Sequence, residues 1–202
     1  MKEIILIGGG GHCHACIDVI ENEDIYLIKG IVLPSLENSK SILGYPVIGT
    51  DQDLPKLLKE TSHALICIGQ IKNFEIRKNN FELLKKYGAN FPIIKSPGAY
   101  SSRHAILGEG TILMHGSIIN SNAQVGANCI VNSRSLIEHD AKVEDHCHIS
   151  TGAIINGGVK VGMGSFIGSG SVLKEGIEIG KRVIIGAGQT ILKNILDGTT
   201  VR

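Results

Sequence analysis

The sequence predicts a two-part chain: an α/β domain with a small, Rossmann-like parallel sheet over residues 1–95, and an all-β parallel β-helix over residues 96–202. The first part alternates short apolar runs with helical patterns, as in a parallel sheet covered by helices. In the second part an aliphatic residue recurs every six positions from Leu107 onward. The composition agrees, because 26 glycines and only 4% aromatic residues favour a core of stacked small aliphatic layers.

The first domain is predicted from apolar runs and their boundary residues. In chain order, the predicted elements are a strand at 3–7, a helix at 12–22, a strand near 29–33, a helix at 51–60, a strand at 63–68 and a helix at 73–87. The first strand (EIILI) is continuously apolar, as expected when both faces are buried. We expect Asp51 to cap the second helix, Pro55 to lie in its first turn, and Gly88 to end the third helix.

The second domain is predicted from its six-residue repeat. The aliphatic positions are Leu107, Leu113, Ile119, Val125, Val131, Ile137, Val143, Ile149, Ile155, Val161, Ile167, Leu173, Ile179, Ile185 and Ile191. Four positions after each comes a mostly small side chain, with bulkier residues such as Gln189 and Ile195 at the end. One large and one small inward position in every hexad indicates a hexapeptide β-helix.

Glycine spacing gives the length of one coil. Gly108, Gly126, Gly162 and Gly180 fall on one lattice with a period of three hexads. Three hexads therefore form one coil of a triangular prism, and we expect about five coils spaced by about 4.8 Å.

Charge and cysteine usage exclude several classes of protein. The 20 basic and 19 acidic residues give a net charge of +1, which does not favour nucleic acid or an anionic membrane as the main partner. No apolar run approaches the roughly 20 residues of a membrane-spanning helix. The five cysteines are odd in number and irregularly spaced, and no signal-peptide pattern precedes them, so we expect the reducing cytoplasm.

Cys13 and Cys16 form a C-x-x-C motif, but no second ligand pair follows at zinc-site spacing. We therefore expect no metal, and expect both thiols to fill the buried side of the first helix.

Four stretches of the sequence resemble one known family. They are IILIGGGGH (4–12), ILGYPVIGTD (42–51), ICIG (66–69) with EIRK (75–78), and SLIEHDAKVEDHCHISTGA (135–153). Together they resemble the bacterial sialic-acid O-acetyltransferase and nucleotide-amino-sugar N-acetyltransferase family. The resemblance implies a left-handed β-helix, acetyl-CoA as acetyl donor, and a homotrimer with active sites between subunits. It also implies a C-terminal G-x-P-A-K-like tail, which this sequence does not contain.

His139 is the candidate catalytic base. It lies two positions after the inward Ile137, so its side chain is expected to project from the prism, between Glu138 and Asp140. A neighbouring carboxylate fixes the tautomer of an imidazole and raises its basicity, which suits removal of a proton from an attacking amine or hydroxyl. The resemblance places the base at His139 and its carboxylate partner at Asp140; the alternative is a solvated surface histidine.

The resemblance also implies the acetyl-CoA contacts. His148 is expected to contact the thioester, and Ser169 and Ala187, three hexads apart, fall at positions that contact CoA. For the last two, the alternative is that turns simply favour small residues. The other histidines of the β-helix, His104, His115 and His146, are expected on the surface.

The glycine loop at 8–11 follows a strand and precedes a helix, the geometry for binding a phosphate at a helix N-terminus. The resemblance implies contacts to a nucleotide-sugar phosphate from Gly10, Gly11, His12 and Gly69. Family members often carry an acidic pair after the second strand, whereas this chain reads IVLPS at 31–35, so the nucleotide is left open.

We therefore expect an N-acetyltransferase that modifies a nucleotide-linked amino sugar for bacterial surface glycans. An O-acetyltransferase of a sialic-acid-like sugar would use the same base. A γ-carbonic-anhydrase-like enzyme would need three histidines that converge on zinc at a trimer interface. His139, His146 and His148 have no obvious partner one coil away, because residue 157 is glycine. A non-enzymatic scaffold would leave the IEHD motif unexplained.

Overall fold

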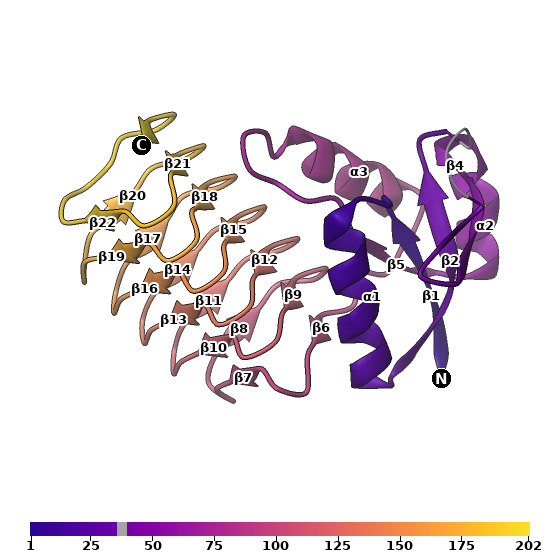
Figure 1. Cartoon of the computed structure of the whole chain (residues 1–202), viewed down its shortest axis with the longest axis horizontal. Coiled ribbons are helices and arrows are strands. Elements are labelled where there is room, and N and C mark those ends of the chain that lie inside the picture. Colours follow the sequence, from indigo (N-terminus) through magenta and orange to yellow (C-terminus); the bar gives the residue numbers. More distant parts are fainter. Residues whose placement is uncertain (36–39) are drawn as a thin grey trace.

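The structure is a computed structural model of the chain that describes residues 1–35 and 40–202. Figure 1 shows an α/β domain at one end of a long prism of stacked coils. The predicted combination of a small parallel sheet and a β-helix is confirmed.

The N-terminal sheet has the strand order β3-β4-β2-β1-β5. Its strands are β1 (Lys2–Ile7), β2 (Tyr26–Leu33), β3 (Ser41–Ile42), β4 (Tyr45–Thr50) and β5 (His63–Ile66). All pairs are parallel except the short β3–β4 pair, which the apolar pattern did not predict. Residues 4–7 of β1 are at most 2% exposed, as expected for a central strand with both faces covered.

Helices α1 (Gly11–Glu23), α2 (Leu54–Glu60) and α3 (Glu75–Lys86) surround this sheet. Asp51 does not cap α2, because a 3₁₀ turn, η1 (Asp51–Asp53), precedes that helix. Thr50 caps this turn instead, in a reciprocal capping box in which its backbone N–H donates to Asp53 Oδ2 at 2.8 Å. Pro55 does lie in the first turn of α2.

Three parallel sheets form the faces of the prism. The docked sheet contains β6 (Ile94–Lys95), β9 (Ile112–Leu113), β12 (Ile130–Val131), β15 (His148–Ile149), β18 (Phe166–Ile167), β21 (Ile184–Ile185) and β23 (Thr200–Val201). The apolar sheet contains β7 (Tyr100–Ser101), β10 (Ile118–Ile119), β13 (Leu136–Ile137), β16 (Ile154–Ile155), β19 (Val172–Leu173) and β22 (Thr190–Ile191). The charged sheet contains β8 (Ile106–Leu107), β11 (Gln124–Val125), β14 (Lys142–Val143), β17 (Lys160–Val161) and β20 (Glu178–Ile179).

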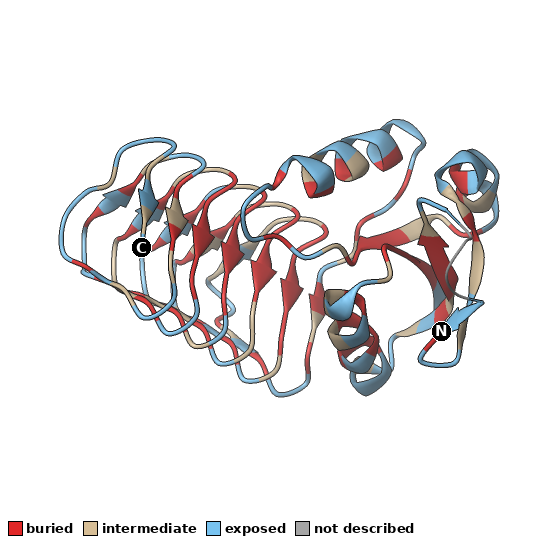
Figure 2. Ribbon diagram, turned by 45° about the horizontal axis from the view of Figure 1, so that its top comes forward, coloured by how far each residue is buried: buried red, intermediate tan, exposed pale blue. Residues whose placement is uncertain are grey.

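The repeat register is confirmed. Ile118 pairs with Leu136 and Leu136 with Ile154, and each step advances by the predicted three hexads. The second residue of each strand from β9 to β22 points inward, and these residues form one continuous buried core (Figure 2).

Both ends of the prism depart from the prediction. β6 and β7 already pair with β9 and β10, so the prism begins at β6, two hexads before Leu107. Their second residues are Lys95 and Ser101, which the aliphatic pattern could not mark. At the other end Ile195 pairs with Ile179 across a coil that is shorter than three hexads. Ile195 thus takes the large inward position, and its expected place in the small column is wrong.

The turns between sheets define three edges. The α1 edge joins the docked and apolar sheets, the His139 edge joins the apolar and charged sheets, and the α3 edge joins the charged and docked sheets. Most turns contain one residue with left-handed backbone, such as Asp140 (φ 62°) and His146 (φ 59°). The predicted glycine column has another cause: a Cβ on Gly108 would lie 2.4 Å from Ala127 N of the next coil, so only glycine permits the stacking.

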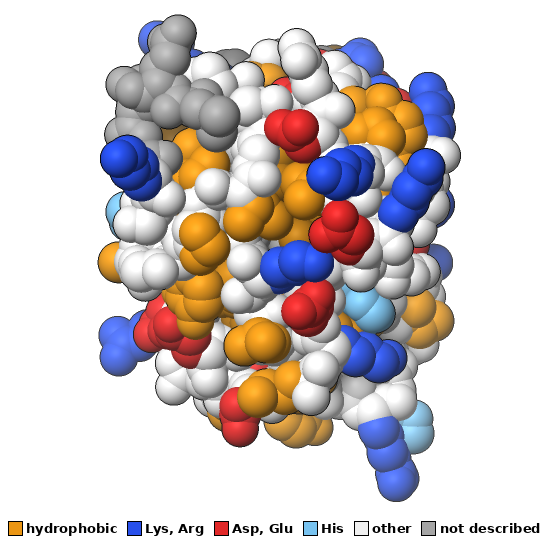
Figure 3. All heavy atoms as spheres, turned by 90° about the vertical axis from the view of Figure 1, so that its right-hand side faces the viewer, with side chains coloured by type: hydrophobic (Ala, Val, Ile, Leu, Met, Phe, Trp, Pro, Cys, Tyr) orange, Lys and Arg blue, Asp and Glu red, His pale blue; other side chains and the backbone are white. Residues whose placement is uncertain are grey.

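The N-terminal domain packs on the docked sheet. One face of α1 shares a core cluster with Ile94, Ile112 and Ile130. From α3, the buried Arg77 donates to Asn128 Oδ1 at 2.7 Å. The far end of this domain displays basic and acidic side chains intermingled with apolar ones (Figure 3). Across the two described ranges, no helix is long and apolar enough to cross a bilayer.

Candidate active site

His139 lies in an exposed turn of the His139 edge. Its Nδ1 is 2.8 Å from Asp140 Oδ2, and its side chain is 65% exposed. On the preceding coil, Asn122 Nδ2 donates to Asp140 Oδ1 at 2.6 Å. The imidazole therefore projects outward as expected, with its Nδ1–H directed to a carboxylate and Nε2 left to receive a proton.

The same contacts set the electrostatics. The hydrogen bond to Asp140 raises the pKa of His139, and the charges of Asp140 and Glu138 add to it. The hydrogen bond from Asn122 is the largest cause that lowers the pKa of Asp140, followed by the bond from His139. Asp140 stays ionised, and His139 is a stronger base than a free histidine.

Two residues that support His139 were missed in the sequence. Asn122 lies one full coil before Asp140, and Gly157 lies one full coil after His139. A Cβ on Gly157 would be 2.8 Å from His139 Cε1 and 2.9 Å from Nε2, so glycine makes room for the ring. The predicted coil length of three hexads could have identified both.

A hollow of about 470 Å³ lies between the N-terminal domain and the docked sheet. Its lining residues are Gly11, His12, Ala15, Gly69, Gln70, Ile71, Asn132 and His148. The structure thus brings together three of the four predicted substrate contacts at the N-terminus of α1, while Gly10 is the exposed N-cap of that helix. We call this hollow the interdomain pocket.

His148 belongs to this pocket and is only 7% exposed. Its Nδ1–H donates to Gln70 O at 2.6 Å, so Nε2 accepts a hydrogen bond from Asn132 Nδ2 at 3.1 Å. Burial lowers the pKa of His148 to about 4. The imidazole is neutral, with its tautomer fixed by the Gln70 carbonyl.

The other predicted residues lie along the prism edges. Ser169 and Ala187 are exposed on successive turns of the α1 edge, and Ser169 Oγ is 2.9 Å from Ser150 Oγ. His139 does not line the interdomain pocket. In one chain, therefore, the pocket and the predicted CoA positions lie at one edge of the apolar sheet and His139 at the other.

Two histidines that were expected on the surface contact the N-terminal domain instead. His146 is 6% exposed and packs against Phe74 and Phe81, because α3 covers this edge. His115 joins the two domains through Asp18, whereas His104 is exposed as expected.

We also inspected the described residues for a metal site and for a second hollow. Residues 1–35 and 40–202 contain no group of three His, Cys, Asp or Glu placed to hold a metal ion. Cys13 and Cys16 are buried on α1, as predicted. A hollow of about 1040 Å³ runs along the charged sheet, and its described lining includes none of the predicted site residues.

Family models match both parts of the chain. Residues 3–84 match the PglD N-terminal domain, residues 140–175 the bacterial transferase hexapeptide (six repeats), and residues 158–193 the hexapeptide repeat of succinyl-transferase. No curated protein matches significantly. Among solved structures, the acetyltransferase domain of PglB from Neisseria gonorrhoeae FA1090, in complex with acetyl coenzyme A, is 30% identical with a TM-score of 0.91. The alignment covers 99% of this chain and 95% of that chain. This chain belongs to the bacterial sugar N-acetyltransferase family.

Two further solved structures share the whole fold. PerB from Caulobacter crescentus, in complex with CoA and GDP-perosamine, is 28% identical with a TM-score of 0.92, over 99% of this chain and 93% of that chain. WeeI from Acinetobacter baumannii AYE, at 24% identity and a TM-score of 0.89, shows the same fold. The β-helix of this sugar acetyltransferase is left-handed, as in the family.

Proposed function

We propose that this enzyme transfers the acetyl group of acetyl-CoA to the amino group of a nucleotide-linked sugar, in the cytoplasm, for bacterial surface glycans. The observation that carries the proposal is the chain from Asn122 through Asp140 to His139, which leaves Nε2 free at the surface. The donor and the acceptor class are supported by the PglB domain, solved with acetyl coenzyme A, and by PerB, solved with CoA and GDP-perosamine.

The reaction needs one base and a site for the oxyanion. The acceptor nitrogen attacks the thioester carbonyl, and His139 Nε2 takes its proton as the C–N bond forms. The C–S bond of the tetrahedral intermediate then breaks, and CoA leaves as the thiol after its sulfur takes up the proton that His139 received, which returns His139 to its neutral form. Asp140 stabilises the imidazolium, and backbone N–H groups are the donors available for the oxyanion.

The interdomain pocket is the proposed acceptor site. The N-terminus of α1 carries no acidic residue in its first turn, so its free N–H groups suit the phosphates of a nucleotide. Gly10, Gly11, His12 and Gly69 are the proposed contacts. His148 is proposed to contact the thioester at the border of this pocket, with Ser169 and Ala187 along the CoA arm.

The apolar sheet supports a homotrimer. The outward side chains of its first five strands form an apolar ladder: Tyr100, Ile118, Leu136, Ile154 and Val172. Thr190 takes this position on the sixth strand, β22. Tyr100 is 56% exposed and Ile118 40% exposed in the single chain. If three copies bury this ladder around a threefold axis, the His139 edge of one copy lies beside the α1 edge of the next. That contact joins His139 to the interdomain pocket, Ser169 and Ala187, which one chain keeps apart.

A thiol-release assay with acetyl-CoA tests the function, using UDP-amino, GDP-amino and sialic-acid-like acceptors. His139→Ala should lower kcat by about a hundred- to ten-thousandfold and leave CoA affinity nearly unchanged. Asp140→Asn should cost less, whereas His148→Ala should mainly impair the use of acetyl-CoA. A His139→Ala enzyme that retains most of its activity with the best acceptor contradicts the mechanism. Preference for a hydroxyl acceptor would favour O-acetylation with the same base.

A further inference from the structure

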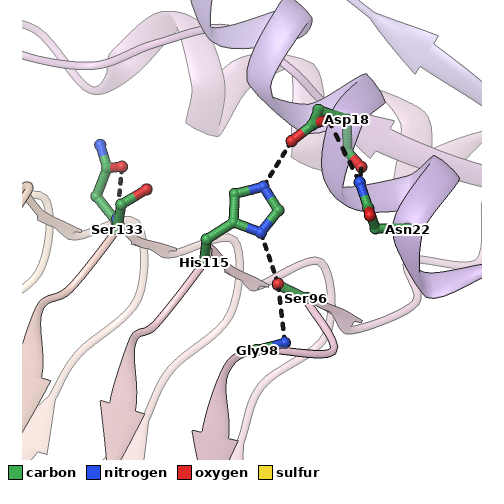
Figure 4. Close-up of polar contacts among 7 residues, drawn as sticks. Asp18, Asn22, Ser96, Gly98, His115 and Ser133 are labelled. Carbon is green, nitrogen blue, oxygen red and sulfur yellow. Dashed lines mark hydrogen bonds and ion pairs between the residues drawn. The ribbon is translucent and has the colours of Figure 1, made fainter.

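A hydrogen-bonded chain links α1 to the first coils of the prism at the α1 edge (Figure 4). His115 Nε2 lies 2.6 Å from Asp18 Oδ2, and His115 Nδ1 lies 2.7 Å from Ser96 Oγ. The backbone N–H of Gly98 donates to the same Ser96 Oγ at 3.2 Å. We call Asp18, His115 and Ser96 the α1 latch.

A neutral His115 satisfies every member of the latch. Because Ser96 Oγ accepts from Gly98, its own hydroxyl proton is free to donate to His115 Nδ1. Nε2–H then donates to the Asp18 carboxylate. Ser96 is 1% exposed, so the base of the latch is fixed in the prism. On α1, Asn22 Nδ2 donates to Asp18 O at 2.7 Å and lies 3.3 Å from Asp18 Oδ1, which orients the carboxylate.

The latch acts on the helix face that lines the interdomain pocket. Gly11, Ala15 and Asp18 follow one another at helical spacing, so they lie along one face of α1. Gly11 and Ala15 line the pocket, and Asp18 continues this face to the latch. The opposite wall of the pocket, Asn132 and His148, belongs to the prism. The distance across the pocket therefore depends on where α1 sits on the prism.

Apolar packing alone does not set that position sharply. α1 buries Cys16, Ile17 and Ile20 in a cluster with Ile94 and Ile112 of the docked sheet. Such contacts favour burial but have no direction, whereas hydrogen bonds of 2.6 Å and 2.7 Å fix both a distance and an orientation. The latch is a directional contact on the pocket-lining face of α1. A second one lies at the C-terminal end of the helix, where the backbone N–H of Lys95 donates to Glu23 Oε1 at 3.2 Å.

We propose that Asp18 and His115 are positioning residues for the acceptor: they hold Gly11 and His12 at the correct distance from Asn132 and His148. This inference rests on the proposed acceptor site in the interdomain pocket. Neither residue lines the pocket, so neither is proposed to touch the substrate.

Kinetics of single and double variants test the latch. Asp18→Ala and His115→Ala should each raise the KM for the acceptor about three- to tenfold, in keeping with a partly exposed charge-assisted hydrogen bond. The KM for acetyl-CoA and kcat should change by less than about twofold, because His139 and the proposed CoA contacts (His148, Ser169 and Ala187) all belong to the prism and keep their places. The double variant should be no worse than the worse single variant, since both break one interaction. Asp18→Asn retains an acceptor oxygen and should recover most of the loss. His14→Ala, an exposed histidine of α1 outside the latch, is the matched control.

Hydrogen exchange gives a readout that does not depend on activity. Backbone amides of residues 11–16 should exchange faster in Asp18→Ala and His115→Ala than in the wild type, while amides of the prism core stay protected. If the wild type acetylates no acceptor, the proposed function fails and hydrogen exchange still decides on the latch. Unchanged exchange at 11–16, or an equal rise in the KM for acetyl-CoA, overturns the proposal.

Discussion

Asp140 combines a structural and a chemical role in one turn. Its left-handed backbone (φ 62°) is one that aspartate adopts more readily than most residues, and its carboxylate bonds both His139 and Asn122. The turn that the repeat requires at every corner thus also holds the carboxylate beside the base.

The pH dependence of the rate follows from this pair. His139 must be neutral to accept a proton, and Asp140 raises its pKa above the ordinary value of about 6.5. Activity should therefore rise with pH through a pKa above that value and be lost as the pH falls through it. In Asp140→Asn this rise in activity should occur at lower pH, and the maximal rate should fall. Profiles of kcat/KM against pH measure this shift. The His139→Ala variant is the control, because an amine acceptor titrates as well. A profile that Asp140→Asn does not shift contradicts the pairing of Asp140 with His139.

Gly157 offers a substitution that separates catalysis from folding. A Cβ at this position would push the His139 ring, which is the mobile end of an exposed side chain, and would meet no backbone atom that close. Gly157→Ala should lower kcat at least about tenfold through misplacement of the base, with thermal stability nearly unchanged. Kinetics and a melting curve on the same sample measure both, and a normal kcat would show that the ring tolerates the displacement.

His148 should make stability depend on acidity. Its pKa is about 4 in the folded chain, so the unfolded chain binds more protons between that value and about 6.5. Stability should therefore fall as the pH drops through this window, by up to about 3 kcal/mol, and be constant with respect to this group above it. Urea titrations at pH 7 and pH 4.5 measure the loss, and it should be smaller in His148→Gln. An equal loss in the variant would assign the effect to other groups.

At the scale of elements, the inward position of each strand carries the stability of the prism. Ile155 is fully buried, so Ile155→Asp should cost several kcal/mol or prevent folding, because the carboxylate finds no partner in an aliphatic core. Lys160 faces outward and pairs with Glu178 at 2.6 Å on the exposed charged sheet. Lys160→Ala should change stability by less than about 0.5 kcal/mol. Denaturant titration distinguishes them, and equal losses would mean that the register is shifted.

The β-helix could be predicted from the sequence because many hexads repeat the same evidence. Elements that occur only once in the chain are harder to predict. The first coil has Lys95 and Ser101 at its inward positions, and the cap of η1 depends on the side chains of Thr50 and Asp53 rather than on Asp51. Local pattern does not specify such features, since packing against the N-terminal domain and a short 3₁₀ turn decide them.

Sequence pattern identifies candidate site residues that are adjacent in the chain, and the three-hexad coil length could have added Asn122 and Gly157. His139 and Asp140 are neighbours, and the glycine loop lies within one short segment. Gln70 and Asn132, which hold His148, are distant from it along the chain, and no local pattern connects them to it. The burial of His146 was missed for the same reason, because only the fold places α3 over that edge.

At the scale of the whole molecule, the proposed trimer can be tested by complementation. Gly11 has open space around its Cβ position, so Gly11→Asp is expected to fold while its charge repels a phosphate at the N-terminus of α1. If each site joins His139 of one copy to the pocket of the next, every mixed trimer of Gly11→Asp and His139→Ala chains has one intact site. Equal mixing with subunit exchange should then restore about a quarter of wild-type activity. No recovery in verified mixed trimers would place the site within one chain.

Because each coil consists of three hexads, the fold also limits which insertions and deletions are compatible with function during evolution. An insertion of one hexad between β11 and β13 would preserve the inward pattern and hence folding, but it would carry His139 to a different edge, away from Asn122. An insertion of three hexads would return the histidine to its edge, one coil spacing further from the N-terminal domain. Gene duplication of whole coils is therefore the natural route by which the prism lengthens, and beyond the coils that hold the site it leaves catalysis unchanged.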